Sequence, residues 1–185
     1  MIPFKSAVVL SSAETFYTEE LTVPAESICD DTTETELQTE TTTALLNETK
    51  ANRNGFTSLS EFKNTGLPIS ELDIPEGLTL DENGIPTDYV YCVDAKATAY
   101  TGDPATASGR VPMPGHIAVN PKEYPYGTEL YIVSADGKYV YGYCIAADTG
   151  GFVKMGNTDV DVYMDNEEMC REWGNKAIKI YILKE

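Results

Sequence analysis

The chain has 185 residues, a formal net charge of −17 and a hydrophobic fraction of 42%. This hydrophobic fraction is sufficient for a packed core, and the strong acidity argues against a basic surface for nucleic acid. The sequence has no apolar run near the roughly 18 residues that a membrane span needs. Its one histidine, His116, excludes a metal centre built from several histidines.

Residues 1–65 are rich in Thr and Glu, which predicts a linker or a disordered region. The segment 30–43 reads DDTTETELQTETTT and holds one aliphatic residue, so it has little to bury. The apolar run Ala7–Leu10 is too short for the apolar part of a secretory signal. The sequence therefore leaves open whether the chain is an exported, processed form or a cytosolic protein.

Residues 66–90 combine aliphatic side chains at irregular spacing with several prolines. Prolines at this density oppose both a long helix and a central strand. We expect an extended strap that packs on the domain that follows. The aliphatic residues expected to face that domain are Leu67, Ile69, Leu72, Ile74, Leu78, Leu80 and Ile85.

Residues 91–185 have the pattern of a small, mainly β domain. Runs rich in Val, Ile, Tyr and Thr predict six strands, at 89–100, 117–119, 129–133, 138–147, 160–164 and 177–183. Asp136-Gly137 predicts a hairpin turn, and Asn166 is a suitable N-cap for one short helix that Gly174 ends. Six short strands predict a closed barrel, because closure removes the free edges.

Ordered motifs in this half resemble the 3D domain, a family of bacterial cell-wall proteins named for three aspartates. The matching segments are Lys96–Thr101, Thr106–Gly109, Ile117–Pro121, Tyr126–Thr128, Ala147–Gly151, Asp161–Tyr163 and Ile178–Leu183. The resemblance covers residues 90–185 and implies a six-stranded double-psi β-barrel.

The resemblance also implies an activity and a location. Several members are peptidoglycan lytic transglycosylases, which cleave glycan strands between two amino sugars without water and leave a 1,6-anhydro sugar. We therefore expect a monomeric enzyme outside the cell or in the cell wall, acting on peptidoglycan glycan strands without a cofactor or a metal. The alternative is a non-catalytic module on the same barrel that binds or remodels wall glycan. Neither function involves nucleic acid or a membrane span.

The catalytic residues that the resemblance implies are Asp161 and Asp148. The leaving glycosidic oxygen must be protonated, so one carboxyl has to be neutral near pH 7. A second carboxylate nearby raises the pKa of the first and stabilises positive charge on the sugar. We place the acid at Asp161, between Val160 and Val162. The substrate-binding residues expected around the pair are Asn120, Thr106, Thr149, Gly150, Gly151, Tyr100 and Tyr126.

Two departures from the family pattern favour the non-catalytic alternative. Asn120 stands where the family has its first aspartate, and an amide cannot act as an acid. The segment from Asp148 to Asp161 is also two positions longer than usual.

Other interpretations of the same residues remain open. Asp148 also fits a turn-forming aspartate, and Asp159 lies on the same face of its strand as Asp161. His116 and Cys144 form a possible base and nucleophile, although a cysteine within a β run is typical of a structural role. A cation site is an alternative for the acidic cluster Asp159, Asp161, Asp165, Glu167 and Glu168.

Four cysteines allow two disulfides. If the chain is exported, we expect Cys144 on a strand to pair with Cys170 on the predicted helix. Cys29 and Cys92 would then form the second bridge and hold the strap in place.

Overall fold

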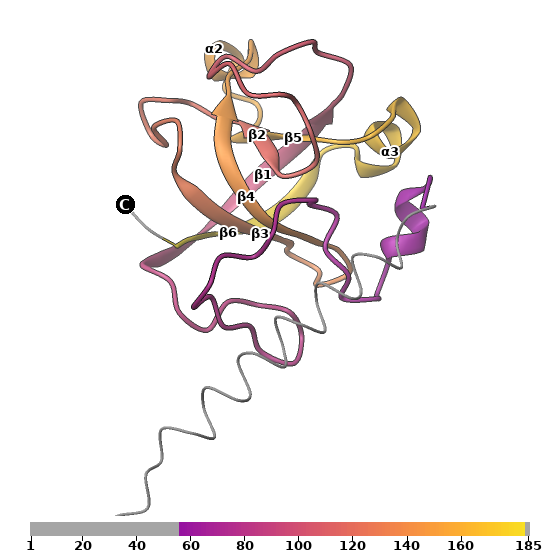
Figure 1. Cartoon of the computed structure of the whole chain (residues 1–185). Coiled ribbons are helices and arrows are strands. Elements are labelled where there is room, and N and C mark those ends of the chain that lie inside the picture. Colours follow the sequence, from indigo (N-terminus) through magenta and orange to yellow (C-terminus); the bar gives the residue numbers. More distant parts are fainter. Residues whose placement is uncertain (1–55, 184–185) are drawn as a thin grey trace, which may run out of the picture. The chain divides into compact units, whose positions relative to one another are not determined.

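The computed structural model describes residues 56–183. Cys29 and the part of the predicted linker before residue 56 lie outside the described residues. The elements can be followed in Figure 1. They are η1 (Leu59–Phe62), β1 (Tyr91–Tyr100), β2 (His116–Ala118), β3 (Glu129–Ser134), β4 (Val140–Asp148), α2 (Phe152–Met155), β5 (Val160–Tyr163), α3 (Glu167–Trp173) and β6 (Lys176–Ile182).

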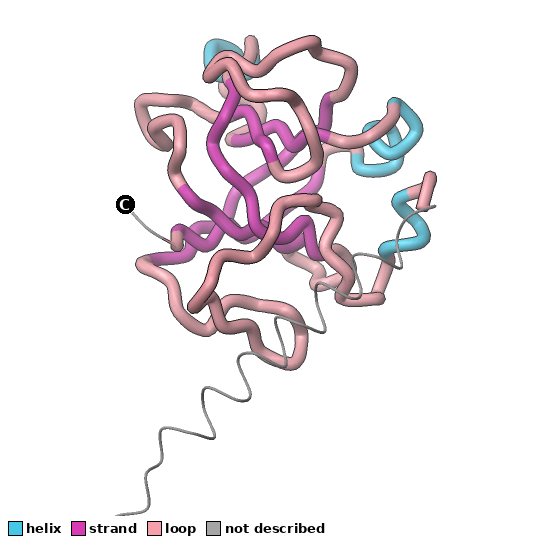
Figure 2. Tube along the Cα trace, in the orientation of Figure 1, coloured by secondary structure: helices cyan, strands magenta, loops and turns pink. Residues whose placement is uncertain are grey.

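The six strands close into a barrel in the order β1-β5-β2-β4-β3-β6, which confirms the predicted fold class. The pairs β1/β5 and β2/β4 are parallel, and the other neighbours are antiparallel. Figure 2 shows the strands gathered together with the short helices outside them. Strands distant in the sequence thus become neighbours, and this placement assembles the candidate site.

Alternate residues of the strands fill the barrel. On β5, Val160 and Val162 are fully buried in the core, so Asp161 between them points to the outer face. The indole of Trp173 on α3 joins the same core and donates a hydrogen bond to the Ala97 carbonyl (3.2 Å). The other core side chains on the strands include Ile117, Leu130, Ile132, Cys144, Ala146, Ile178, Ile180 and Ile182.

The predicted hairpin joins β3 to β4. The Asp136 carboxylate accepts hydrogen bonds from the Ser134 hydroxyl (2.7 Å) and from the amide of Lys138 (3.2 Å). Gly137 has φ +70° and donates its amide to the Ser134 carbonyl (2.9 Å). The Asp-Gly pair forms this turn because Gly adopts positive φ without a steric penalty.

The strap at residues 66–90 packs on the outside of β3, β4 and β6. The amides of Ile69 and Ser70 donate to the carbonyls of Val140 and Tyr141 at the start of β4 (3.0 and 2.7 Å). A second apolar cluster joins the strap to the outer faces of these strands: Ile74, Tyr131, Val133, Val140, Tyr143 and Tyr181, with Leu72, Leu78, Leu80 and Ile85 around them.

The strap lies very close to β4 at one glycine. Gly142 has φ +97°, and a Cβ there would lie 2.7 Å from the Cβ of Pro68. A side chain at this position is therefore excluded by both the backbone and the strap.

Two further short helices, η1 and α2, accompany the strands and α3. The 3-10 helix η1 begins at a capping box formed by Ser58 and Glu61, and its Leu59 and Phe62 are 0% and 4% exposed in the barrel core. Residues 56–65, which we assigned to the linker, thus include side chains of the barrel core. The four-residue helix α2 lies between Asp148 and β5.

The expected Cys144–Cys170 disulfide is not formed, because Cys92, Cys144 and Cys170 are all free thiols. The Cys144 side chain is fully buried among the core residues, with its Sγ 3.5 Å from the Leu130 carbonyl oxygen on the neighbouring strand. Burial also raises its pKa well above that of an ordinary thiol. The predicted second bridge joins Cys92, which is a free thiol, to Cys29, which lies outside the described residues.

Candidate functional site

The strand β2 brings the two candidate aspartates together. Ala118 of β2 pairs with Asp148 of β4 on one side and with Asp161 of β5 on the other. Thr98 of β1 continues this row beside Asp161. Since adjacent strands lie about 4.8 Å apart, the backbones of the two aspartates are roughly 10 Å apart. This spacing allows both carboxyl groups to face one ligand on the outside of the barrel.

Asp161 has the surroundings of a carboxyl that is easily protonated. Burial and the nearby Asp148 carboxylate raise the pKa of Asp161 to about 6, against a lowering effect of a hydrogen bond with Thr98. Its Oδ1 is buried and has no hydrogen-bond partner within residues 56–183. Leaving such an oxygen unsatisfied is costly, so this atom is suited to a ligand hydroxyl or ether oxygen.

Asp148 is fixed by three hydrogen bonds and is only 6% exposed. Its Oδ1 accepts the amides of Ala107 and Thr149 (both 2.8 Å), and its Oδ2 accepts the Tyr100 hydroxyl (3.1 Å). The bond with Thr149 bears out the alternative of a turn-forming aspartate in part. The bond with Ala107 goes further, because it holds the loop 101–115 over the end of β4.

Tyr100 lies two residues after Thr98, on the same face of β1. Its ring meets that of Tyr163 edge-on at 5.3 Å between centroids. Burial and the Asp148 carboxylate raise the pKa of the Tyr100 hydroxyl above its usual range, so the hydroxyl remains a donor to Asp148. Tyr100, which we expected among the substrate-binding residues, therefore orients a carboxylate.

Asn120 forms a turn directly after β2. Its Oδ1 accepts the amide of Lys122 (3.2 Å), and its Nδ2 donates to Glu123 (2.7 Å). Asn and Asp both form such side-chain-to-backbone turns. The replacement of the family's first aspartate by Asn120 is therefore compatible with the local structure.

The remaining predicted binding residues lie in different places. Thr106 is buried, and its hydroxyl bonds within its own loop, to Ser108 and to the backbone of Arg110. Thr149 and Gly151 are exposed beside Asp148, at the start of the segment that leads into α2. Tyr126 lines a separate hollow whose lining includes neither aspartate.

The structure distinguishes between the alternative roles of the acidic residues and of Cys144. The Asp159 carboxylate accepts the Lys96 amide (2.8 Å) and is exposed, whereas Asp161 is half-buried. Within the described part of the chain, no group of three acidic, cysteine or histidine side chains could hold a metal ion. The buried, protonated thiol of Cys144 does not fit the nucleophile alternative.

Thr98 was missed at the sequence level, although it lies within the motif Lys96–Thr101. Its hydroxyl bonds to Asp161, and only its pairing with β5 reveals this contact. The signal that could have found it is its position two residues before Tyr100, which places both side chains on one face. Within residues 56–183, no helix is long and apolar enough to cross a membrane.

Part of the chain is similar to known proteins. Residues 115–184 match the model of the 3D domain, which confirms the resemblance over this segment. Two curated relatives are from Bacillus subtilis. YabE, named as a candidate cell wall shaping protein, is 36% identical over 96 residues, and YocH, named as a cell wall-binding protein, is 33% identical over 96 residues. Each match covers 47% of this chain.

The chain spans only 22% of YabE and 31% of YocH. Among solved structures, the Escherichia coli protein MltA is similar in a crystal structure described as a lytic transglycosylase fold. The match has 25% identity and a TM-score of 0.34, and it covers 43% of this chain and 27% of MltA. A crystal structure of MltA with bound chitohexaose matches with a TM-score of 0.32 at 25% identity.

Proposed function

We propose that this chain is a lytic transglycosylase-like enzyme of the bacterial cell wall, with Asp161 as the acid and base. The observation that carries the proposal is the buried, unpartnered Oδ1 of Asp161, in a carboxyl whose pKa is raised to about 6 beside the Asp148 carboxylate. The 3D-domain match and the cell-wall names of both relatives support the choice of substrate.

In the first step, the Asp161 carboxylic acid donates its proton to the glycosidic oxygen. The bond from the anomeric carbon to this oxygen breaks, and its electron pair stays on the leaving sugar, which becomes a free hydroxyl. Positive charge develops on the ring that remains. The Asp148 carboxylate, which accepts hydrogen bonds from Tyr100 and two backbone amides, stabilises this charge. It lies across strand β2 from Asp161, with Ala118 between the two.

In the second step, the ionised Asp161 removes the proton of the sugar's 6-hydroxyl. The oxygen freed in this way attacks the anomeric carbon and closes the 1,6-anhydro ring. Asp161 ends protonated, as it began, and no water is consumed. One acid/base group is therefore sufficient, in contrast to the two positioned carboxyls of ordinary glycosidases.

The test is mass spectrometry of purified peptidoglycan after incubation with the full chain. We expect anhydro-muropeptides with the wild type and none with Asp161→Asn. The matched control is Asp159→Asn, which removes a carboxylate two residues earlier and should leave activity nearly unchanged. Full activity in Asp161→Asn, or equal loss in both variants, would contradict the assignment.

The second candidate function is a non-catalytic module that binds wall glycan. The observation that favours it is the similarity to YocH, which is named as a cell wall-binding protein. In this case, the wild type and Asp161→Asn would both bind sedimented peptidoglycan, and neither would release anhydro products.

A further inference from the structure

A groove lined by tyrosines lies at one end of the barrel. One wall is the continuous segment Glu123–Glu129, and the opposite wall is the paired residues Tyr91 and Ile182 at the outer ends of β1 and β6. The groove has a volume of about 520 Å³. Tyr91 and Tyr126 are 42% and 41% exposed, so their rings are accessible to a ligand.

The groove is acidic as well as aromatic. Glu123 and Glu129 line it, and no lysine, arginine or histidine of the described chain is among its lining residues. Tyrosine faces attract a cation, and a carboxylate forms a strong hydrogen bond with an ammonium group. The acidity of the whole chain adds to this preference for a positive ligand.

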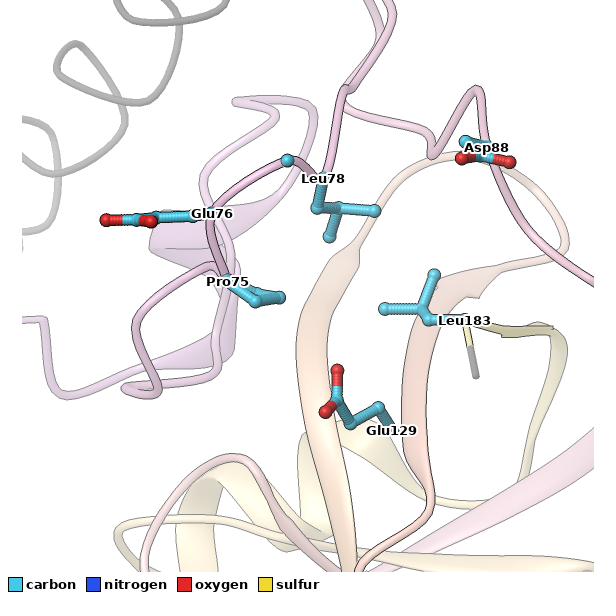
Figure 3. Close-up of a pocket in the computed structure, with 7 residues that line it drawn as sticks. Pro75, Glu76, Leu78, Asp88, Glu129 and Leu183 are labelled. Carbon is cyan, nitrogen blue, oxygen red and sulfur yellow. The ribbon is translucent and has the colours of Figure 1, made fainter. Parts of the chain in front are cut away.

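Glu129 connects this groove to a smaller hollow under the strap. The hollow has a volume of about 120 Å³, and its lining includes Pro75, Leu78, Leu183 and Glu129. Figure 3 shows the Glu129 carboxylate pointing into the space between these apolar side chains, while Glu76 points away from it. The Tyr143 hydroxyl also bonds to Glu129 and fixes its carboxylate. A carboxylate with an apolar surround suits an ammonium group on an aliphatic stem.

We propose that this groove binds a peptide segment with a free primary ammonium, the aliphatic stem lying on the tyrosines and the ammonium reaching Glu129. If the proposed function holds, the natural ligand is the stem peptide of peptidoglycan, whose side-chain amine is free where it is not cross-linked. This site is separate from the aspartate pair, since neither Asp148 nor Asp161 lines the groove.

The experiment titrates the full chain with an N-acetylated stem tetrapeptide that carries a lysine with a free ε-ammonium. The comparison peptide has the same lysine acetylated, and a chitin tetrasaccharide tests the glycan. We expect calorimetry to show binding of the free amine at least tenfold tighter than binding of the acetylated peptide. Backbone NMR shifts should concentrate at residues 123–129 and at Tyr91.

The variants Tyr126→Ala and Glu129→Gln should each weaken peptide binding about tenfold, and the matched control Glu168→Gln on α3 should not. Because Tyr126 is exposed, its variant tests the proposal even if Glu129→Gln fails to fold. Equal affinity for both peptides, or binding of the tetrasaccharide alone in this groove, would overturn the proposal.

The two proposals fail separately. Asp161→Asn should retain peptide binding while it loses glycan cleavage. In the wild type, cleavage without peptide binding would overturn the groove alone, and peptide binding without cleavage would overturn the enzyme alone.

Discussion

Asp161 and Asp148 lie in one row of the barrel, yet their surroundings differ. Asp148 accepts three hydrogen bonds, and two of these come from backbone amides, whose positions are fixed by the fold. Asp161 keeps one buried oxygen without a partner in the described residues. In the proposed mechanism, this asymmetry assigns a fixed charge to Asp148 and the exchange of a proton to Asp161.

The raised pKa of Asp161 predicts the pH dependence of cleavage. The acid must be protonated, and burial raises its pKa to about 6. We expect kcat/KM to be highest below pH 6 and to fall about tenfold for each pH unit above it. Initial rates of anhydro-muropeptide release between pH 5 and 8 measure this profile. A profile that is flat across this range would contradict Asp161 as the acid.

The same shift predicts a pH-dependent cost in stability. Because the folded pKa lies above the unfolded value of 3.8, the native state binds the proton more tightly, and ionisation of Asp161 destabilises the fold as pH rises. Asp161→Asn should therefore raise the free energy of unfolding at pH 7.5 by about 1–2 kcal/mol, with allowance for partial exposure. The difference should vanish near pH 3, where both proteins are neutral at this position. Urea denaturation at the two pH values checks this, and greater stability of the wild type at pH 7.5 would contradict it.

The strap is held against β4 by close contact between the two backbones. A methyl group at Gly142 would collide with Pro68 and would occupy a backbone conformation with φ +97°. We expect Gly142→Ala to lower the free energy of unfolding by about 2–4 kcal/mol, from strain and overpacking together.

The matched control for this variant is Gly137→Ala at the hairpin tip. Gly137 also has positive φ, but nothing lies within 4 Å of its added Cβ. It should lose only about 1 kcal/mol, the conformational part of the effect. Equal losses in the two variants, measured by chemical denaturation, would show that the strap contact contributes nothing.

The strands and α3 could be predicted because residues within or next to each element indicate its structure. Alternating β-branched and aromatic residues mark the strands, Asp136-Gly137 marks the hairpin, and Asn166 caps α3 with its side chain on the Met169 amide (2.9 Å). Asp148 and Asp161 were nominated from motifs, and both pair with Ala118 of β2 in the structure.

Other features leave no local signal. The bond from Ala107 to Asp148 uses a backbone amide 41 residues away, and any residue except proline can provide it. A four-residue helix such as α2 is too short to show a periodic pattern. The burial of Leu59 could not be predicted, since one turn with two apolar residues does not reveal its partner.

The folded part of the chain begins before the strap, at or before η1. Leu59 of η1 is fully buried in the barrel core. We expect Leu59→Ala to cost about 2–5 kcal/mol and to lower the melting temperature by roughly 10 °C. The control Val111→Ala truncates a side chain that is 76% exposed and should change stability by less than about 0.5 kcal/mol. Equal melting of the two variants would show that η1 does not contribute to the fold.

The closure of the barrel has a consequence for how the chain folds. Within residues 56–183, strand β1 pairs with β5 and β6 alone, and its Tyr91 pairs with Ile182 of β6. Such distant pairings make folding slow, on the order of milliseconds to seconds. During synthesis, β1 is made before both of its partner strands, so it stays unpaired until β5 and β6 follow. Its charged Asp94 and Lys96 are residues that discourage pairing with a second chain during this interval.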